Sequence, residues 1–375
     1  MYLEDILNNI RIFTLQEQHE DWERERKKVS ALFEITPRCN FQCVHCYVGS
    51  DRKLSDTLSY DDVIKVLDVL HKNGILFLSF SGGDPLLRSD FKDIYLYAKK
   101  KGFMVDILTN GTMITEELVE VFQEYPPILV DVSIYGTSNS TYEKITGNKN
   151  GFDLLLRGLK LLKKGGIRFA LKGILMRDNY HELKEMEEIS NAYGAENFRY
   201  NSELVADRQC TDAPKTHEID ALEGVLNEIV NGSNTELMKK RGELISSGSE
   251  TDNYRSEMVY RCGIGDLAVH INYLGEMGPC VECIDRKNIF EYEFDELCAE
   301  FEKFKLMEAK PSYKCYDCKY KTFCSSCPQA RKREYGDETI VKEKDCIVAI
   351  LKYMYYVDNR SIEELKDYYK KNYRR

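Results

Sequence analysis

The stretch TPRCNFQCVHCY, residues 36–47, places three cysteines within eight positions directly after the apolar run ALFEI. The three are Cys39, Cys43 and Cys46, with the spacing C-x3-C-x2-C. Closed structural zinc sites use four protein ligands, whereas a four-iron cluster held by three thiolates leaves one iron free for another ligand. The spacing therefore favours an open iron–sulfur cluster, with zinc completed by His45 as the alternative.

Composition limits the class of protein. The chain has 375 residues, 43% hydrophobic and 31% charged, which indicates a globular protein with one large and one smaller domain. Its formal net charge of −10, with both signs interleaved, argues against a nucleic-acid surface. No apolar run approaches the ~20 residues of a membrane helix, and no signal peptide is evident. We therefore expect a cytoplasmic chain, in which thirteen cysteines favour metal or catalytic use over disulfides.

Short apolar segments and helical patterns alternate from residue 30 onward. Ser59 and Asp62 predict a capping box before a helix that ends near Gly74, and further helices are predicted at residues 89–102, from 115, at 151–164 and from 179 or 180 to 193. Six segments have the composition of buried parallel strands: 30–35, 75–80, 103–108, 128–134, 167–175 and 195–200. This alternation predicts an α/β fold, either an open sheet or a complete or partial barrel.

Chemistry-bearing sequences follow the first four of these strands. The cysteines follow the first, SGGDP (81–85) the second and TNGT (109–112) the third, and SIYG (133–136) closes the fourth. Active sites in such folds lie at the carboxyl ends of the strands, so we expect these sequences at one mouth. SGGDP alone is equally compatible with a tight turn, but its place one strand after the cysteines favours a functional role.

The cysteines together with SGGDP resemble the signature of the radical S-adenosylmethionine (SAM) enzymes, over roughly residues 30–205. The resemblance implies a partial (β/α)6 barrel and a [4Fe–4S] cluster on Cys39, Cys43 and Cys46, with the amino and carboxylate groups of SAM on the fourth iron. It implies an enzyme that cleaves SAM to a 5′-deoxyadenosyl radical, which abstracts hydrogen from the substrate.

The resemblance also implies which residues contact SAM. Asp84, where most members have glutamate, accepts a bond from the SAM amino group. Many members hold the SAM carboxylate with an arginine where Thr146 stands, and Lys172 is the substitute that we predict. The residues expected to contact SAM are Gly82, Gly83, Asp84, Thr109, Asn110, Ser133 and Lys172.

The second half has its own cysteine pattern. Cys262-x12-Gly-x4-Cys280 is followed by C-x2-C-x5-C-x2-C at residues 315–327 and then by Cys346. Paired C-x2-C also occurs in zinc ribbons, but the extended order resembles the SPASM extension of radical SAM enzymes, which holds two auxiliary iron–sulfur clusters. By resemblance the distal ligands are Cys315, Cys318, Cys324 and Cys346, and the proximal ligands are Cys262, Cys280 and Cys327, with either Cys283 or an open position as the fourth.

Two cysteines remain. Cys298 lies in the amphipathic run FDELCAEFEKF and is predicted to be a core residue. Cys210 lies in the polar stretch ADRQCTDAPKTHEID. It has either no specific role or a catalytic one. The predicted organisation is an N-terminal helical segment (1–29), a radical SAM core (30–210), a helical linker (211–260), a SPASM domain (261–350) and a basic, Tyr-rich helical tail (351–375), which is either solvated or holds an acidic substrate segment.

Three substrate classes share this combination of barrel and extension. Sulfatase maturases place an aspartate directly after the cysteine of G-x4-C, and Val281 at that place argues against them. Tailoring of a tetrapyrrole or another small molecule is a further alternative. The run DVSIYGTSNSTYEKITGNKNGF resembles the peptide-modifying group, so we predict oxidative modification of a ribosomally synthesised peptide, giving a crosslink, thioether or similar bond.

Partners follow from that function. About thirty residues precede the first strand, so we expect a leader peptide to be recognised by a separate protein or by the barrel mouth and tail. An electron donor such as flavodoxin or ferredoxin is implied, and a nucleic acid or membrane is not. A non-catalytic metal-binding scaffold is the alternative from a different class, and it predicts no cleavage of SAM.

Overall fold

The computed structural model describes residues 27–232, 235–247 and 257–373. Most of the predicted N-terminal helical segment and part of the polar stretch before residue 257 lie outside these ranges. Within them one nine-stranded sheet has the order β6-β5-β4-β3-β2-β1-β7-β8-β9. The strands are β1 (Ser30–Thr36), β2 (Phe77–Gly82), β3 (Met104–Thr109), β4 (Leu129–Ile134), β5 (Phe169–Ile174), β6 (Phe198–Asn201), β7 (Ala268–Ile271), β8 (Glu276–Gly278) and β9 (Lys287–Asn288).

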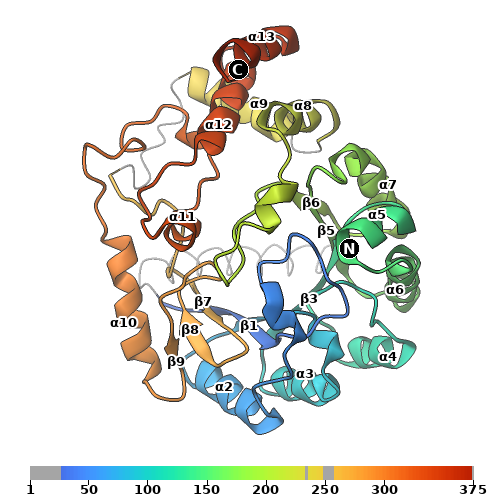
Figure 1. The fold of residues 1–375 in the computed structure, drawn as a ribbon. Coiled ribbons are helices and arrows are strands. Elements are labelled where there is room, and N and C mark those ends of the chain that lie inside the picture. The colour runs from blue at the N-terminus through green and yellow to red at the C-terminus, as the bar shows by residue number, and fades with distance from the viewer. Residues whose placement is uncertain (1–26, 233–234, 248–256, 374–375) are drawn as a thin grey trace, which may run out of the picture.

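The first six strands are parallel neighbours in chain order, as the alternating pattern predicts. Helices cover their outer face in Figure 1: α2 (Tyr60–Lys72), α3 (Phe91–Lys100), α4 (Glu116–Glu124), α5 (Asn139–Thr146), α6 (Gly151–Gly165) and α7 (Leu183–Tyr193). The capping box of Ser59 and Asp62 is present at the start of α2. Each α-helical crossover returns the chain to the same edge, so the strands' carboxyl ends meet at one mouth.

Helix α5 was not predicted from the sequence. It has eight residues, and Ser138 caps it by accepting a hydrogen bond from the backbone N–H of Thr141. Its apolar content is low, so its pattern is weak, and it forms because Tyr142 and Ile145 pack into the main core. Its last turn accepts backbone bonds from residues 42 and 44, which ties the helix to the cysteines.

The C-terminal region continues the same sheet. Strand β7 pairs in parallel with β1, while β8 and β9 follow as antiparallel strands. The helices here are α8 (Ala221–Asn231), α9 (Thr235–Ser246), α10 (Phe294–Lys305), α11 (Pro328–Tyr335), α12 (Glu343–Tyr356) and α13 (Ile362–Asn372). Helix α12 runs through residue 350, so the domain boundary expected there falls inside a helix. Cys298 of α10 packs against the main core, as predicted.

Membrane spans were searched in the described part of the chain. None of its helices combines the length and the apolar character that crossing a bilayer requires.

Candidate active site

The cysteine loop, residues 37–47, leaves the carboxyl end of β1 and packs directly on SGGDP from the neighbouring strand. The backbone N–H of Gly83 donates to the carbonyl of Thr36 at 2.8 Å, and that of Asp84 donates to the carbonyl of Arg38 at 2.8 Å. A Cβ atom on Gly83 would lie 2.2 Å from the Arg38 carbonyl oxygen, and one on Gly82 would lie 2.1 Å from the Thr36 carbonyl oxygen. Only glycine permits this approach.

Asp84 joins the loops that follow β2 and β3. It is fully buried, and its carboxylate accepts hydrogen bonds from the Thr109 hydroxyl and the Asn110 N–H, both at 2.8 Å, and from the Leu86 N–H at 3.0 Å. Burial raises the pKa of Asp84 to about 6 despite these bonds. The shorter side chain thus reaches backbone donors of its own chain, and its contact with the SAM amino group stays a prediction.

Asn110 carries the network to the first cysteine. Its side-chain amide donates to the side-chain oxygen Oδ1 of Asn40 at 2.7 Å and approaches Cys39 Sγ at 3.8 Å. The Asn40 amide in turn donates to the Thr112 hydroxyl at 2.8 Å. TNGT therefore holds the cysteine loop by side-chain bonds, a role in addition to the predicted contact with SAM.

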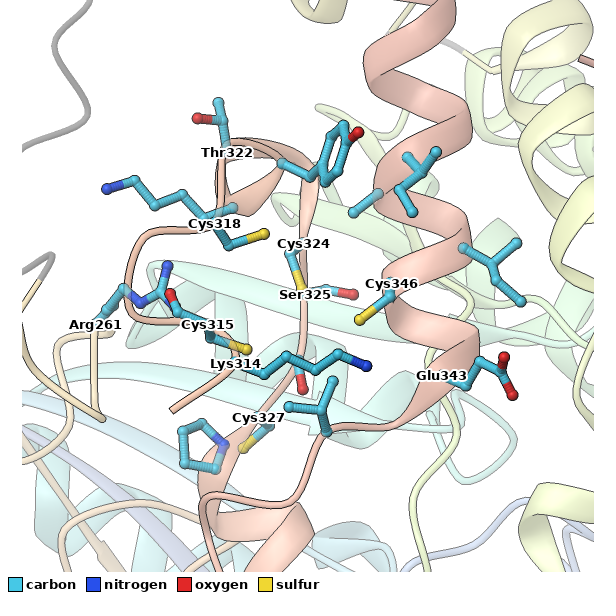
Figure 2. A pocket seen from close by; sticks show the side chains of 18 of the residues that line it. Arg261, Lys314, Cys315, Cys318, Thr322, Cys324, Ser325, Cys327, Glu343 and Cys346 are labelled. Atoms are coloured by element: carbon cyan, nitrogen blue, oxygen red, sulfur yellow. The ribbon is translucent and has the colours of Figure 1, made fainter. Parts of the chain in front are cut away.

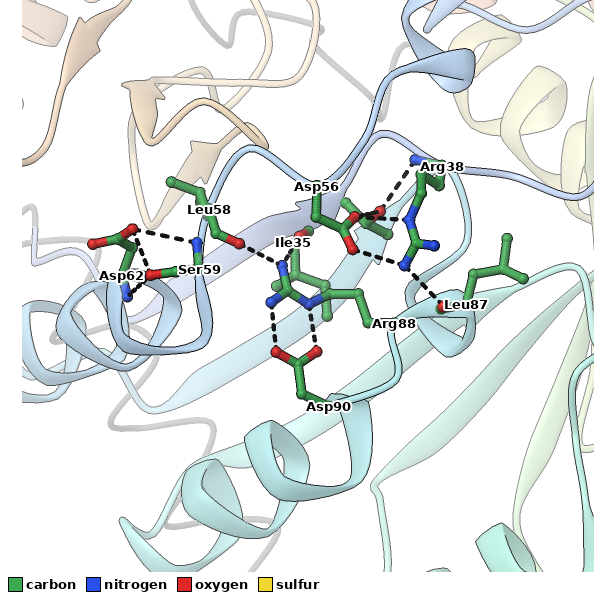
Figure 3. Close-up of polar contacts among 10 residues, drawn as sticks. Ile35, Arg38, Asp56, Leu58, Ser59, Asp62, Leu87, Arg88 and Asp90 are labelled. Atoms are coloured by element: carbon green, nitrogen blue, oxygen red, sulfur yellow. Dashed lines mark hydrogen bonds and ion pairs between the residues drawn. The ribbon is translucent and has the colours of Figure 1, made fainter.

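Two arginines fix the start of the cysteine loop, as Figure 3 shows. Arg38, directly before Cys39, donates to both carboxylate oxygens of Asp56, at 3.0 and 2.7 Å, and to the carbonyl of Leu87. Arg88 is buried and donates to the carbonyl of Ile35 at 2.8 Å and to Asp90. Sequence reasoning did not identify either residue, because the contacts that tie them to the neighbouring loop, Arg88 to Ile35 and Arg38 to Leu87, join residues about fifty positions apart.

The thiols of the cysteine loop lie in a largely apolar environment. Burial and the nearby Asp84 carboxylate raise the pKa of Cys39 to about 12, and burial holds the pKa of Cys43 well above its ordinary value. An uncompensated thiolate is costly there, whereas a bound iron ion supplies the opposite charge. The residues therefore fit a metal cluster, although His45 also lies partly buried beside Tyr135, with ring centroids 5.2 Å apart.

Lys172 and Ser133 lie opposite each other on adjacent strands. The ammonium of Lys172 is 3.4 Å from the carboxylate of Asp131, which Arg199 also binds. Lys172 is thus paired within the barrel, and its contact with the SAM carboxylate stays a prediction. Thr146, where many family members have arginine, is buried and donates its hydroxyl to the Tyr142 carbonyl.

A buried charge cluster connects the cysteine loop to the C-terminal region. Glu34 of β1 is fully buried and accepts hydrogen bonds from Tyr47 at 2.9 Å and Arg208 at 2.7 Å, with His270 of β7 at 3.2 Å. Arg286 donates to His270 and to the carbonyls that follow β8. The sequence signal for this cluster was a lone glutamate inside the apolar run ALFEI.

The C-terminal cysteines converge on one pocket of about 1180 Å³. In Figure 2 the four predicted distal cysteines surround its upper part and Cys327 lies at its lower end. The cysteines that line it are Cys262, Cys315, Cys318, Cys324, Cys327 and Cys346. The structure therefore gathers the whole distal set, together with two of the proximal set.

The remaining proximal cysteines lie just behind this pocket in a small apolar cluster with Tyr260 and Phe304. Burial, together with Cys283 and Cys327, raises the pKa of Cys280 to about 12, so the three sulfurs are electrostatic neighbours. The backbone N–H of Cys283 donates to the Cys280 carbonyl at 3.3 Å, a turn that brings the two residues close together. This arrangement is compatible with Cys283 as a ligand.

Ligand spacing separates a cluster from a single ion. Among the described residues no three His, Cys, Asp or Glu side chains come close enough to share one metal ion. In a four-iron cluster each thiolate binds a different iron, so its cysteines stand further apart than the ligands of one zinc ion. The preference for iron–sulfur clusters over zinc, including a zinc site completed by His45, therefore rests on the cysteine pattern of the sequence.

Comparison with protein families matches residues 33–189 to the Radical SAM superfamily. The chain contains a radical SAM domain. The expected use of SAM and a [4Fe–4S] cluster is thereby confirmed for this domain, and so is its enzymatic class. The matched residues of the radical SAM domain include the cysteine loop, SGGDP and TNGT, and they end within α7.

The alignments with individual relatives extend beyond the radical SAM domain and cover most of the chain. AlbA of Bacillus subtilis (strain 168), an antilisterial bacteriocin subtilosin biosynthesis protein, is 25% identical over 79% of this chain and 66% of AlbA. An AdoMet-dependent heme synthase of Nitratidesulfovibrio vulgaris is 24% identical over 84% of this chain and 90% of that protein. The structure of Streptococcus suis SuiB bound to its precursor peptide SuiA matches with a TM-score of 0.67, 18% identity and coverage of 88% of this chain and 79% of SuiB. SuiB shows a shared fold.

Proposed function

We propose that this protein is a radical SAM enzyme that oxidatively modifies a ribosomally synthesised peptide, with auxiliary iron–sulfur clusters in its C-terminal region. One observation carries this proposal. The strand that leads into the cysteine loop, β1, is the direct neighbour of β7, so one sheet supports both the radical SAM domain and the C-terminal cysteines. A second redox centre beside the first suits a reaction that ends with loss of an electron.

The residues divide into three tasks. Cys39, Cys43 and Cys46 hold the [4Fe–4S] cluster, and when bound it supplies, with SAM, a 5′-deoxyadenosyl radical that removes a hydrogen atom from the substrate. Gly82 and Gly83 bring backbone up to the methionyl group. The remaining SAM contacts are those predicted from the sequence, namely Asp84, Thr109, Asn110, Ser133 and Lys172.

The C-terminal cysteines hold two auxiliary clusters. The distal ligands are Cys315, Cys318, Cys324 and Cys346, and the proximal ligands are Cys262, Cys280, Cys283 and Cys327. The pocket of about 1180 Å³ and the neighbouring Cys280 and Cys283 support these sets. All thirteen cysteines are free thiols, which suits the reducing cytoplasm where clusters of this kind are assembled.

Two similarities support a peptide substrate. AlbA is named for bacteriocin biosynthesis, and the SuiB structure contains a precursor peptide. By this proposal a flavodoxin or ferredoxin delivers electrons, and a separate protein or the barrel mouth and tail binds the leader. The Val281 position still argues against sulfatase maturation.

The test uses the full chain, reconstituted without oxygen, together with a candidate precursor encoded nearby. We expect about twelve irons per chain if all three clusters are of the four-iron type. Replacing Cys39, Cys43 and Cys46 by Ala should remove about one third of the iron and abolish 5′-deoxyadenosine. Modification should lower the peptide mass by about two, the two hydrogens lost on forming a bond. Stoichiometric zinc, or SAM cleavage by the triple variant, would contradict the proposal.

A tetrapyrrole substrate is the second candidate. The similarity to the AdoMet-dependent heme synthase favours this substrate, because the alignment covers 90% of that protein. Incubation with an iron porphyrin followed by mass spectrometry separates the two: oxidation of the porphyrin with no change in the peptide assigns the second function, and the reverse assigns the first.

A further inference from the structure

A carboxylate–imidazole pair lies at the mouth of the barrel, outside the cysteine loop and the SGGDP contacts. Asp178 lies four residues after β5, and His217 ends the short helix η4 (Pro214–His217). His217 Nδ1 is 2.7 Å from one oxygen of Asp178, and the ammonium of Lys144 is 2.6 Å from the other. Asp178 is 8% exposed and His217 is 28% exposed, so the carboxylate is covered and the imidazole is accessible.

The pair borders the cysteine loop. The carbonyl of His217 accepts from the Arg177 N–H at 2.9 Å, which fixes η4 to the end of β5. Lys144 belongs to α5, whose last residues accept backbone bonds from the cysteine loop at 2.8 and 2.9 Å. These bonds, together with the ion pair between Lys144 and Asp178, connect the pair through α5 to the loop where the radical SAM domain places its chemistry.

The contacts settle which ring nitrogen is available. Lys144 and His217 keep the pKa of Asp178 below its ordinary value although partial burial opposes this, so the group is a carboxylate at neutral pH. A carboxylate accepts but does not donate, so Nδ1 of a neutral His217 carries the hydrogen. That leaves the Nε2 lone pair directed away from Asp178, and the described part of the chain shows no hydrogen bond to Nε2. The charged and titratable groups near the imidazole are Asp178, Lys144, Arg177 and His45.

We propose that His217, oriented by Asp178, is the general base that takes the substrate proton released when the new bond forms. This rests on the proposed function. The substrate loses two hydrogens in total: one leaves as an atom and ends in 5′-deoxyadenosine. The other leaves as a proton to His217 Nε2, while its electron passes to an iron–sulfur cluster as oxidant. Two bonds to hydrogen break and one new bond forms in the peptide. Of the two electrons left over, one leaves with the hydrogen atom and the other passes to the cluster.

Other acidic or basic groups near the mouth are less suited to this step. Asp84 and Glu34 are fully buried, and each carboxylate accepts hydrogen bonds from within the chain. Asp131 pairs with two cations, Lys172 on one carboxylate oxygen and Arg199 on the other, so both oxygens are engaged. The position at which sulfatase maturases place an aspartate is Val281 in this chain, and a valine cannot take a proton. His217 combines a fixed ring, a free nitrogen and partial exposure.

The first experiment compares His217→Gln with wild type under single-turnover conditions. We expect the yield of dehydrogenated peptide per 5′-deoxyadenosine to fall by about 100-fold, a typical contribution of general base catalysis. The matched control is His181→Gln, since His181 is 62% exposed on the same side of the barrel and should leave the ratio at the wild-type value. A ratio unchanged in His217→Gln overturns the proposal. So does a weaker affinity for SAM by calorimetry with the ratio preserved, because His217 would then be a SAM contact.

The second experiment needs no activity. In ¹⁵N-histidine NMR spectra of the chain, His217 should show the tautomer with hydrogen on Nδ1, and Asp178→Asn should abolish that preference. Hydrogen on Nε2 in the wild type overturns the proposal. If the wild type makes no peptide product, the proposed function fails by itself, and the NMR result then decides whether this imidazole has the form a base requires.

Discussion

At the scale of single residues, Gly83 shows how closely two loops must approach at the mouth. Its Cβ position lies 2.2 and 2.4 Å from two carbonyl oxygens of the cysteine loop, so Gly83→Ala must push that loop away. We expect this variant to lose about four of twelve irons, measured by iron and sulfide analysis. Gly224→Ala is the control, because its nearest neighbour atom is 3.6 Å away and alanine favours a helix. A full iron content in Gly83→Ala would show that the loop adapts.

Glu34 gives a prediction for stability. Burial alone would raise its pKa, but His270 and Arg208 hold the pKa below the ordinary 4.5. Burial likewise lowers the pKa of His270 from 6.5. In both cases the unfolded chain binds more protons, so stability is present at neutral pH and is lost as the pH falls below about 6.5 and further below 4.5. Urea unfolding of the metal-free chain at several pH values measures this loss, and stability that rises on acidification contradicts it.

The same carboxylate can be tested by substitution. Glu34→Gln leaves the largely buried Arg208 without its countercharge, so we expect a loss of about 3–5 kcal/mol in unfolding free energy at neutral pH. Glu117→Gln is the control, since its partner Lys92 is on the surface and such pairs contribute at most about 1 kcal/mol. Equal stabilities of the two variants would contradict this expectation and would mean that water solvates the unpaired Arg208 guanidinium.

At the scale of elements, the turn from Cys280 to Cys283 decides the proximal cluster. Cys283 is 2% exposed and packs with Cys280, so we expect Cys283→Ala to change the EPR spectrum of the reduced proximal cluster. Cys298→Ala on α10 should leave every cluster signal as in the wild type. An unchanged spectrum in Cys283→Ala would indicate an open coordination site instead.

At the scale of the molecule, the C-terminal region depends on its metal. Between residues 306 and 327 the structure has turns and one short helix, η5 (Lys321–Phe323), and Phe323 is one of few buried apolar side chains. Iron–thiolate bonds should therefore supply much of its order. We expect removal of iron by a chelator to expose this segment to limited proteolysis, while β1–β6 stay resistant. Cleavage sites mapped by mass spectrometry check this, and an unchanged pattern contradicts it.

The barrel was predictable from the sequence because its signals are local. Buried strands such as β1 and β4 are short apolar runs. The capping box of Ser59 and Asp62 marks the start of α2, and Gly74 marks its end. The cysteine spacing predicted the cluster type and, by resemblance, the cofactors, because three thiolates and a following glycine loop form a compact pattern. Helix α5 was missed since its few apolar residues give no clear period, and packing alone stabilises it.

The sequence by itself determined the chemistry expected of the cysteine loop and the alternation of strands and helices, because both depend on neighbours in the chain. Only the tertiary structure decided that β7 pairs with β1, that Glu34 meets His270 across 236 positions, and that Asp178 orients His217. Such contacts join residues far apart in sequence, and their energy comes from removing charges and polar groups from water together. No local pattern records which distant partner compensates each of them.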